Sequence, residues 1–492
     1  MEAWMEAVLA VLGTAALHYA VQLVVLVRAL TRPGREPASR LAWVLVILAV
    51  PALGVVLYLL LGEVSPGRRR FARLQAVREA LPVTVPGAGH APLPAEARGA
   101  FARAAAVNGF APVPGNAANL LAGNEAAVEA LVADIDAARE TVHLLVYIWL
   151  DDTSGRRLMA AVTRAALRGV RCRVMVDGLG SRRLLRSKGW AAMRAAGVET
   201  GIAFDTSLAP VRMLMERIDI RNHRKIFVID GAIAYCGSQN CADAAFDIKP
   251  RHGPWVDLML RLEGPVVWQM QALFLADWLA HSRPVAGPLA AQAEAEAAAL
   301  LAAPAQPQPG GFAALAYGTG PDLSSNAVPD VVGLLLAAAQ REVVLTTPYF
   351  VPTPGLEEQL CATALRGVAV TLILPARNDS RMVYWASRAS YPGLLRAGVA
   401  IHEHAPGLLH AKAVTVDGAL AMVGSANLDR RSFELNFENN LLISDPAVTA
   451  ALRVRQQSYL ADSRPVTADQ VAAWTLPRRL LYNAVAMLSP VL

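Results

Sequence analysis

The sequence predicts an α/β protein of two related α/β halves packed as a pseudo-dimer, preceded by an N-terminal hairpin of two transmembrane helices. Three observations support this fold class: two apolar stretches near the N-terminus, a repeated order of strands and helices, and one motif that occurs once in each repeat. With 492 residues, the chain can hold two or three domains, each with its own core. Its apolar content of 54% is higher than is usual for a soluble protein, which indicates membrane segments in addition to a globular part.

The expected hairpin occupies residues 1–64. Residues 3–27 and 41–61 are each long enough to cross the hydrocarbon core of a bilayer as a helix. A cleaved signal peptide is the alternative for the first stretch, but the chain starts without positive residues and the apolar run is too long. Arginines flank both stretches, so the positive-inside rule favours a cytoplasmic main domain by a narrow margin.

Positive charge gathers just after the second apolar stretch. The net charge is +6, and an arginine cluster follows the hairpin: Arg68, Arg69, Arg70, Arg73 and Arg78. Such a cluster could bind nucleic acid or anionic lipid, and beside membrane helices we expect anionic headgroups and no nucleic acid. Anchoring of the helix end is the alternative role, and the two roles are compatible.

The cysteines indicate neither a metal site nor a disulfide framework. They are Cys172, Cys236, Cys241 and Cys361, and none has the spacing of a metal clip. We interpret them as reduced packing residues, and we expect no metal and no cofactor.

Two segments of biased composition divide the remaining chain. A basic, Pro/Gly-rich linker is expected at 65–116 and an Ala/Pro-rich linker at 284–311. They delimit a first half at 117–283 and a second half at 312–462, and a C-terminal segment remains at 463–492.

The two halves repeat one order of elements. In the first half, strands at 142–149 and 172–176 flank a helix, and in the second half strands at 343–349 and 370–374 do the same. Strands that alternate with helices at this spacing indicate a parallel or mixed sheet covered by helices. Two such units facing each other would place a site at their seam.

One motif, H-x-K-x4-D followed by G-S-x-N, recurs in both halves at identical spacing. Its marked residues are His223, Lys225, Asp230, Ser238 and Asn240 in the first half and His410, Lys412, Asp417, Ser425 and Asn427 in the second. Because residues two apart on a strand share a face, each histidine lies beside a lysine. The combined set suits a phosphodiester: the cations and the Ser and Asn side chains bind phosphate, one imidazole attacks phosphorus and the other protonates the leaving alkoxide.

Four carboxylates near the motifs have two possible roles each. Asp230 and Asp417 belong to the motif, but each precedes a glycine between two β-rich runs, which is typical of a hairpin turn and favours structural support over substrate contact. Asp257 and Glu438 start strands downstream of the two motifs. Either could orient a histidine and raise its basicity, or could simply lie at the surface.

With its duplicated motif, the chain resembles the phospholipase D superfamily over residues 117–462. Finer features are similar to the bacterial cardiolipin synthases: the N-terminal hairpin, the run 427–438 and the C-terminal residues 488–492. The chain departs from that pattern at Gly237-Ser238, where many of these enzymes have two glycines, and it has extra residues before the first motif.

The resemblance implies phospholipase D-like halves and a phosphatidyl transfer without metal. By analogy, His223 attacks a phosphatidylglycerol and becomes phosphorylated, while His410 protonates the departing glycerol. A second phosphatidylglycerol then accepts the phosphatidyl group, giving cardiolipin, while Lys225, Lys412, Asn240 and Asn427 hold the phosphate. The resemblance also implies a multi-pass protein of the bacterial inner membrane with anionic phospholipids as partners.

Several alternatives stay open. The same pocket serves a phospholipase D-type phosphodiesterase with water or another alcohol as acceptor, or a nuclease, although the hairpin and the apolar end at 480–492 favour lipid. A non-catalytic membrane scaffold is a third hypothesis. The intact His and Lys residues of both motifs argue against it. The near equivalence of the motifs leaves open from the residues alone which histidine is the nucleophile.

Overall fold

The computed structural model forms two compact units. The first unit contains residues 1–68 and 207–219, and the second contains 69–206 and 220–490. The described residues are 1–32, 37–62, 67–205, 217, 219–246, 248–281, 288–323 and 326–487. The end of the C-terminal segment, 488–492, for which we expected contact with a membrane surface, lies outside them.

The first unit consists of one long helix and a short helical hairpin. Its elements are α1 (Glu2–Thr31), α2 (Pro37–Ala49), α3 (Pro51–Leu57) and the π-helical turn η1 (Tyr58–Gly62). In the described part of the chain, residues 12–31 form the one helix that is long and apolar enough to cross a membrane. Val25, Ile47 and Val55 pack together between α1 and the hairpin, and Gln22 donates a hydrogen bond of 3.1 Å to the backbone oxygen of Ile47.

The second apolar stretch, 41–61, is not the continuous spanning helix that we expected. Pro51 lacks an N–H group and disfavours helical geometry in the residue before it, and Val50 accordingly has φ −135° and ψ 74°. The helix therefore ends at Ala49, and a second one begins at Pro51.

The two arms on either side of this break fold back on each other. The rings of Trp43 and Tyr58 lie 5.3 Å apart, and a Cβ atom at Gly54 would lie 2.6 Å from the backbone oxygen of Val46. Residues equally far from the break thus face each other, as in an antiparallel pair. Each arm is only about 18 Å long at 1.5 Å per residue, whereas the hydrocarbon core of a bilayer is roughly 30 Å thick.

One mixed sheet runs through both halves of the second unit. Among the described residues it has 16 strands. Their order is β20 (Ser463–Val466), β14 (Ala400–His404), β13 (Ala369–Pro375), β11 (Glu342–Thr346), β16 (Ala413–Val416), β17 (Leu420–Gly424), β19 (Asn436–Ser444), β10 (Phe312–Thr319), β1 (Val113–Leu120), β9 (Met259–Glu263), β7 (Ile233–Gly237), β6 (Ile226–Ile229), β2 (Thr141–Val146), β3 (Arg171–Asp177) and β4 (Glu199–Ala203), with β5 (Arg221–Asn222) beside β19.

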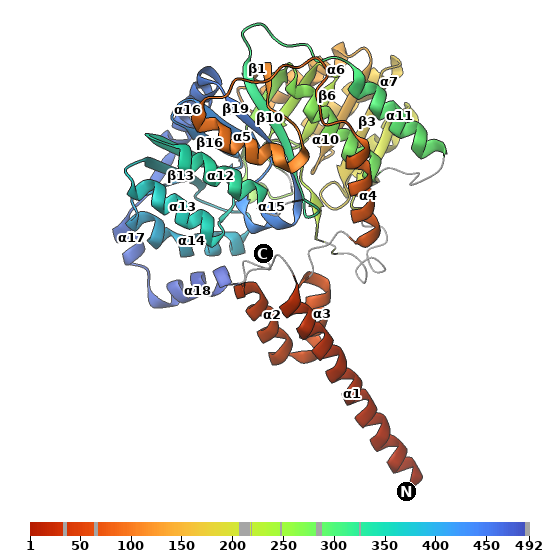
Figure 1. The fold of residues 1–492 in the computed structure, drawn as a ribbon, viewed down its shortest axis with the longest axis vertical. Coiled ribbons are helices and arrows are strands. Elements are labelled where there is room, and N and C mark those ends of the chain that lie inside the picture. The colour runs from red at the N-terminus through yellow and green to blue at the C-terminus, as the bar shows by residue number, and fades with distance from the viewer. Residues whose placement is uncertain are drawn as a thin grey trace. The chain divides into compact units, whose positions relative to one another are not determined.

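The halves are related by a pseudo-twofold axis between β1 and β10. From this central antiparallel pair outward, β9, β7, β6, β2, β3 and β4 of the first half correspond to β19, β17, β16, β11, β13 and β14 of the second. In each half three strands run parallel and the strands that carry the motif run antiparallel to them. Figure 1 shows the second half, in cyan and blue, beside the first half, in yellow and green, with β10 at their junction. The mixed α/β architecture with two related halves is confirmed.

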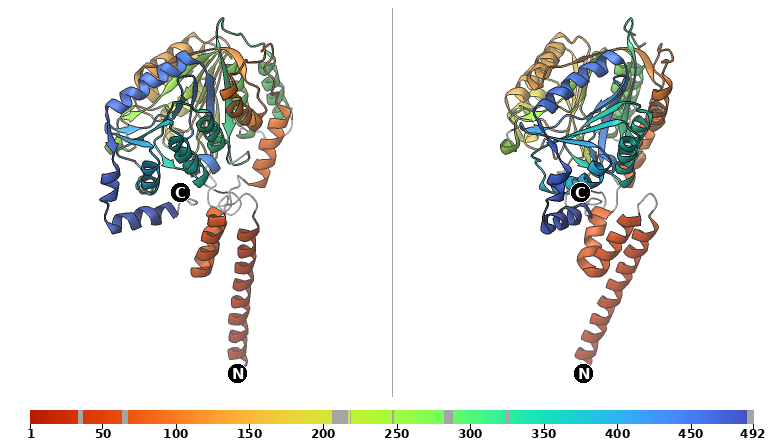
Figure 2. Two further views of the ribbon diagram at one scale, coloured as in Figure 1. Left: turned by 60° about the vertical axis from the view of Figure 1, so that its left-hand side comes forward. Right: turned by 90° about the vertical axis from the view of Figure 1, so that its left-hand side faces the viewer.

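Helices cover both faces of this sheet (Figure 2). They are α6 (Asn124–Ala137), α7 (Thr153–Leu167), α8 (Lys188–Ala195), α10 (Val266–His281), α12 (Ala327–Ala338), α13 (Pro354–Leu365), α14 (Arg381–Arg396), α15 (Arg430–Glu434) and α16 (Pro446–Ala461). Two further helices, α17 (Ala468–Ala472) and α18 (Leu476–Met487), pack against α14. Every described residue of α10 except Ala276 and His281 is buried, so this helix forms part of the core beneath the motif strands.

Both expected linkers contain helices. Residues 65–116 include α4 (Arg68–Ala80) and α5 (Ala95–Asn108) as well as the start of β1, and residues 284–311 include α11 (Pro288–Ala302). Small side chains explain the difference, because Ala97, Ala100 and Ala104 are buried and let α5 pack closely. Composition alone identifies these segments as linkers and does not reveal their helices.

Candidate active site

Two short parallel pairings bring each motif histidine to a strand of the other half. β5 pairs with the start of β19, and β15 (Leu408–Leu409) pairs with β8 (Trp255–Val256). One residue further along, the N–H of His223 donates to the oxygen of Phe437 and the N–H of His410 donates to the oxygen of Val256, both at 2.8 Å. The next residue on each partner strand is a carboxylate.

Each histidine is therefore held by the carboxylate of the opposite half. Nδ1 of His223 lies 2.8 Å from the Glu438 carboxylate, and Nδ1 of His410 lies 2.6 Å from that of Asp257. All four side chains are buried. Asp257 and Glu438 thus contact histidines, but each contacts the histidine of the opposite half: Asp257 contacts His410, and Glu438 contacts His223.

The electrostatics fix the protonation of these pairs. Burial lowers the pKa of His223 and of His410 to about 4, and the nearby lysines act in the same direction while the carboxylates oppose them. Burial alone would raise the pKa of Asp257, but His410, Lys412 and Ser238 together outweigh it and hold this pKa at about 2. Near neutral pH the carboxylates are ionised and accept a hydrogen bond from Nδ1–H, so each neutral ring carries its lone pair on Nε2.

The motif lysines lie beside their histidines, as the spacing predicts. Nζ of Lys225 donates to the backbone oxygen of His223 at 2.7 Å, and Nζ of Lys412 donates to that of His410 at 2.8 Å. Lys412 is also 3.0 Å from Nε2 of His410. Burial lowers the pKa of Lys225 to about 8, and burial together with the charge of Lys225 lowers that of Lys412 to about 7.

The two motif serines do not line the pocket, contrary to their expected phosphate-binding role. Ser238 is fully buried, donates to Asp257 at 2.6 Å and accepts from the N–H of Leu258. Ser425 is equally buried and donates to Glu438. Each serine hydroxyl therefore donates a hydrogen bond to a carboxylate that orients a histidine. Because both serines are fully buried, a phosphate in the cavity cannot reach their hydroxyl groups.

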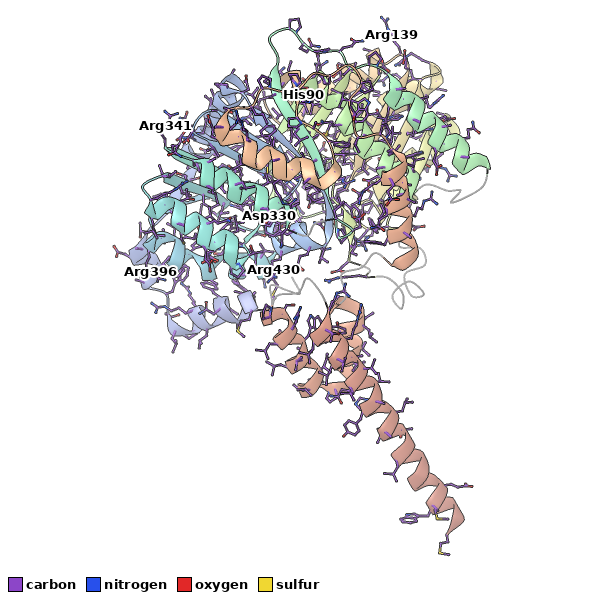
Figure 3. The ribbon with its side chains drawn as sticks, in the orientation of Figure 1. His90, Arg139, Asp330, Arg341, Arg396 and Arg430 are labelled. Atoms are coloured by element: carbon purple, nitrogen blue, oxygen red, sulfur yellow. The ribbon has the colours of Figure 1, made fainter. Side chains whose placement is uncertain are left out.

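The motif aspartates lie in hairpin turns rather than at the pocket. The Asp230 carboxylate accepts from the backbone N–H groups of residues 139–141, each at 2.8 Å. Asp417 does the same with residues 340–342. Figure 3 shows Arg139 and Arg341, whose N–H groups take part, at the outer edge of the unit, far from Arg430, which neighbours the pocket residues Asp429 and Arg431. Neither aspartate lines the cavity that contains the histidines, so this geometry does not support a catalytic role for Asp230 and Asp417 although both belong to the motif.

One cavity of about 420 Å³ contains both histidines. Asn240 and Asn427 line it, as expected of phosphate ligands. The first asparagine accepts a hydrogen bond from the N–H of Ile148 through Oδ1, which leaves its amide donors for a ligand.

Other pocket residues were not predicted from the sequence. They include Tyr147, Arg182, Arg183, Arg221, Lys249, Trp255, Tyr349, Asp379 and Asp429. The rings of Tyr147 and Trp255 lie 5.0 and 4.4 Å from those of His223 and His410. The two tyrosines offered a signal in the sequence, because Tyr147 and Tyr349 each come shortly after the first strand of the repeat, β2 and β11 respectively.

In the described part of the chain, no group of three or more His, Cys, Asp or Glu side chains is placed to hold a metal ion. The expectation that the reaction needs no metal or cofactor stays a prediction.

Comparisons with known proteins agree with this site. The family described as "Cardiolipin synthase, PLD-like domain" matches residues 131–278 and 334–459, and "Phospholipase_D-nuclease N-terminal" matches residues 20–63. The chain is 35% identical over 475 residues to cardiolipin synthase A of Proteus mirabilis, covering 93% of this chain and 94% of the relative. It is 36% identical over 477 residues, with the same coverage, to cardiolipin synthase A of Cronobacter sakazakii.

A solved structure shows the same fold. The phosphatidylserine synthase of Haemophilus influenzae superposes with a TM-score of 0.55 at 16% identity, covering 76% of this chain and 95% of that one. Together with two matched domains and relatives of nearly full length, the duplicated His-Lys site shows that this chain belongs to the phospholipase D-like family of cardiolipin synthases.

Proposed function

We propose that this enzyme transfers a phosphatidyl group between two phosphatidylglycerol molecules and forms cardiolipin and glycerol. The observation that carries the proposal is the pair of histidines in one cavity, each with a carboxylate on Nδ1 and a lysine beside it. The names of the relatives at 35–36% identity support the same activity. Phosphatidylglycerol and other anionic phospholipids are the proposed partners, with no nucleic acid.

The first step consumes one phosphatidylglycerol. Nε2 of His223 attacks phosphorus, so a P–N bond forms and the bond from phosphorus to the headgroup glycerol oxygen breaks. The departing oxygen takes a proton from the His410–Lys412 pair, whose Nε2 and Nζ atoms lie 3.0 Å apart. Lys225, Lys412, Asn240 and Asn427 stabilise the negative charge on the non-bridging oxygens.

The second step consumes the acceptor. A headgroup hydroxyl of a second phosphatidylglycerol gives its proton to His410 while its oxygen attacks phosphorus, and the P–N bond to His223 breaks. The net reaction converts two phosphatidylglycerols into one cardiolipin and one glycerol, and both histidines return to their starting state.

The geometry favours His223 over His410 as the nucleophile. Among the described residues, none donates a hydrogen bond to Nε2 of His223, whereas Nε2 of His410 is contacted by Lys412. His223 is also more accessible from the cavity, at 9% exposure against 3% for His410. A free lone pair that faces the pocket is what an attacking imidazole needs.

Membrane attachment completes the proposal. We place the chain in a bacterial inner membrane, held by α1, with the second unit in the cytoplasm. The hairpin of α2 and α3 enters the bilayer and returns, in place of the second crossing that the sequence predicted.

A direct assay tests the proposed reaction. Purified protein in liposomes of labelled phosphatidylglycerol, without added metal, should give cardiolipin and free glycerol, and His223→Ala should give neither. Phosphatidic acid as the sole product would make the enzyme a phospholipase D-type hydrolase with water as acceptor. Unchanged lipid with the intact protein would favour the non-catalytic scaffold.

A further inference from the structure

The two halves contribute different charged side chains to the active-site cavity. The first half contributes three arginines to its lining, Arg182, Arg183 and Arg221. Arg221, two residues before His223, is only 4% exposed and pairs with the buried Asp177 at 3.5 Å. In the second half, the position two residues before the histidine is Leu408, which is fully buried against Trp255 and Phe246. Guanidinium groups of this kind suit the phosphate of a phosphatidyl group.

The second half contributes Arg431 and two carboxylates, Asp429 and Asp379. Asp379 lines the cavity with a side chain that is 5% exposed, accepts from the hydroxyl of Tyr349 at 2.6 Å and pairs with Nζ of Lys249 at 2.6 Å. Lys249 and Tyr349, with a smaller contribution from His410, lower the pKa of Asp379 against the effect of burial, so this carboxyl group is ionised. Lys249 is itself 43% exposed and is neutralised by this contact.

The Asp379 carboxylate has no counterpart in the other half. Asp379 comes four residues after the end of β13, and the residue four positions after the end of β3 is Ser181. Ser181 is fully buried and holds backbone groups of Tyr147 and Trp149. The difference between the halves is therefore not a requirement of the fold.

A carboxylate in a cavity for phosphates repels the substrate unless it serves a neutral part of it. An ionised carboxylate only accepts hydrogen bonds, and its two oxygens offer about four acceptor positions, of which Tyr349 and Lys249 take two. The remaining positions suit hydroxyl donors. Hydroxyl groups enter and leave this cavity at His410, because that histidine exchanges protons with the alcohol.

We propose that Asp379 binds a free hydroxyl of the glycerol headgroup beside His410, so that the cavity selects a polyol over water or a monohydric alcohol. This inference rests on the proposed function and adds to it the residue that recognises the leaving and the entering alcohol. Tyr349 and Lys249 position the carboxylate, and the hydroxyl next to the reacting one donates to it.

The test compares two competing alcohols that differ by one hydroxyl. The full chain in liposomes of phosphatidylglycerol receives equal concentrations of 1,2-propanediol and 1-propanol, and mass spectrometry measures the two phosphatidyl alcohols. The intact enzyme should favour the diol. Loss of a charged hydrogen bond to that hydroxyl should lower the diol-to-propanol ratio about tenfold or more in Asp379→Asn.

Two further variants control the comparison. Asp134→Asn removes a carboxylate that also bridges a tyrosine, Tyr235, and a cation, Arg261, but outside the cavity, and it should leave the ratio unchanged. In Asp379→Asn, Lys249 loses its ionic partner and adds a positive charge to the cavity. The double variant Lys249→Gln/Asp379→Asn removes this charge as well, and it should show the same loss of diol preference as Asp379→Asn.

The outcomes separate this inference from the proposed function. A ratio that stays the same in Asp379→Asn, with both products reduced equally, would overturn the hydroxyl site and leave phosphatidyl transfer intact. An intact enzyme that yields only phosphatidic acid in both alcohols would overturn phosphatidyl transfer and the hydroxyl site together.

Discussion

Glu438 hydrogen-bonds Nδ1 of His223 across 215 residues of sequence, from the opposite half of the sheet. The same arrangement joins Asp257 to His410, so neither half of the enzyme contains a complete catalytic pair. The pseudo-symmetric body is thus required by the chemistry as well as by packing.

Loss of the Glu438 charge should impair the attack by His223. In Glu438→Gln the imidazole loses the acceptor that fixes its tautomer, and we expect cardiolipin formation to fall about 10²- to 10⁴-fold. Initial rates on phosphatidylglycerol liposomes measure the change. Ser425→Ala, which removes only the hydroxyl that supports this carboxylate, should have a smaller effect in the same direction.

The nucleophile can be identified by trapping the phosphoenzyme. With a phosphatidyl donor that carries a p-nitrophenol leaving group, no protonation by His410 is needed, so His410→Ala should form a phosphatidyl adduct on His223 that accumulates because the acceptor is not deprotonated. Acid-free proteolysis and mass spectrometry locate the adduct. An adduct on His410 in the His223→Ala variant would reverse the assignment.

The motif aspartates should affect stability and not catalysis. Asp230 holds three backbone N–H groups, so Asp230→Ala should destabilise the folded second unit by about 1–3 kcal/mol. Thermal unfolding of the detergent-solubilised protein measures this. Turnover per folded molecule should stay near that of the intact enzyme, and a large loss of turnover without loss of stability would contradict the structural role.

Local patterns explain which features were predictable from the sequence. The strand period of two places His223 beside Lys225, and an aspartate before a glycine gives the turn at Asp230, where φ is +51°. The repeat of the motif gives the two halves. These features depend on residues that are close in sequence.

Features that depend on distant segments were missed. The exchange of Asp257 and Glu438 between the histidines requires the pairing of β5 with β19 and of β8 with β15, and nothing in the local sequence encodes that register. The roles of Ser238 and Ser425 follow from the same exchange, because each serine contacts the carboxylate that serves the other half's histidine.

The pH dependence of kcat/KM should have a limb on each side of neutrality. Burial lowers the pKa of His223 to about 4, so the nucleophile becomes neutral and the rate rises as pH increases through that value. Burial also lowers the pKa values of Lys412 and Lys225 to about 7 and 8, so the phosphate site loses charge and the rate falls as pH increases further. Rates between pH 4 and 9.5 in metal-free buffer measure both limbs.

A lysine variant tests the origin of the alkaline limb. Arginine stays charged throughout this range, so the residual activity of Lys412→Arg should decline at higher pH than that of the intact enzyme. An alkaline limb at the same pH in both proteins would assign it to another group.

The broken second helix predicts the topology of the N-terminus. Because Trp43 faces Tyr58 across the turn at Val50 and Pro51, residues 37 and 62 lie at the same end of the hairpin, and α1 remains the one crossing in the described part of the chain. The N-terminus and the second unit should then lie on opposite sides of the membrane. The four native cysteines would also react, so we would first replace them with alanine. Glu2→Cys then reports on the N-terminus, and Arg139→Cys reports on the second unit, where Arg139 is exposed and lies at the edge in Figure 3.

A membrane-impermeant maleimide applied to intact spheroplasts distinguishes the two topologies. Labelling at position 2 with protection at position 139 fits a single crossing with a re-entrant hairpin. If α2 and α3 instead formed a second full crossing, both cysteines would lie on the same side and would be labelled or protected together. Changing Pro51→Ala should move the protein toward that second pattern, because it restores the N–H group and the helical geometry that the turn at Val50 excludes.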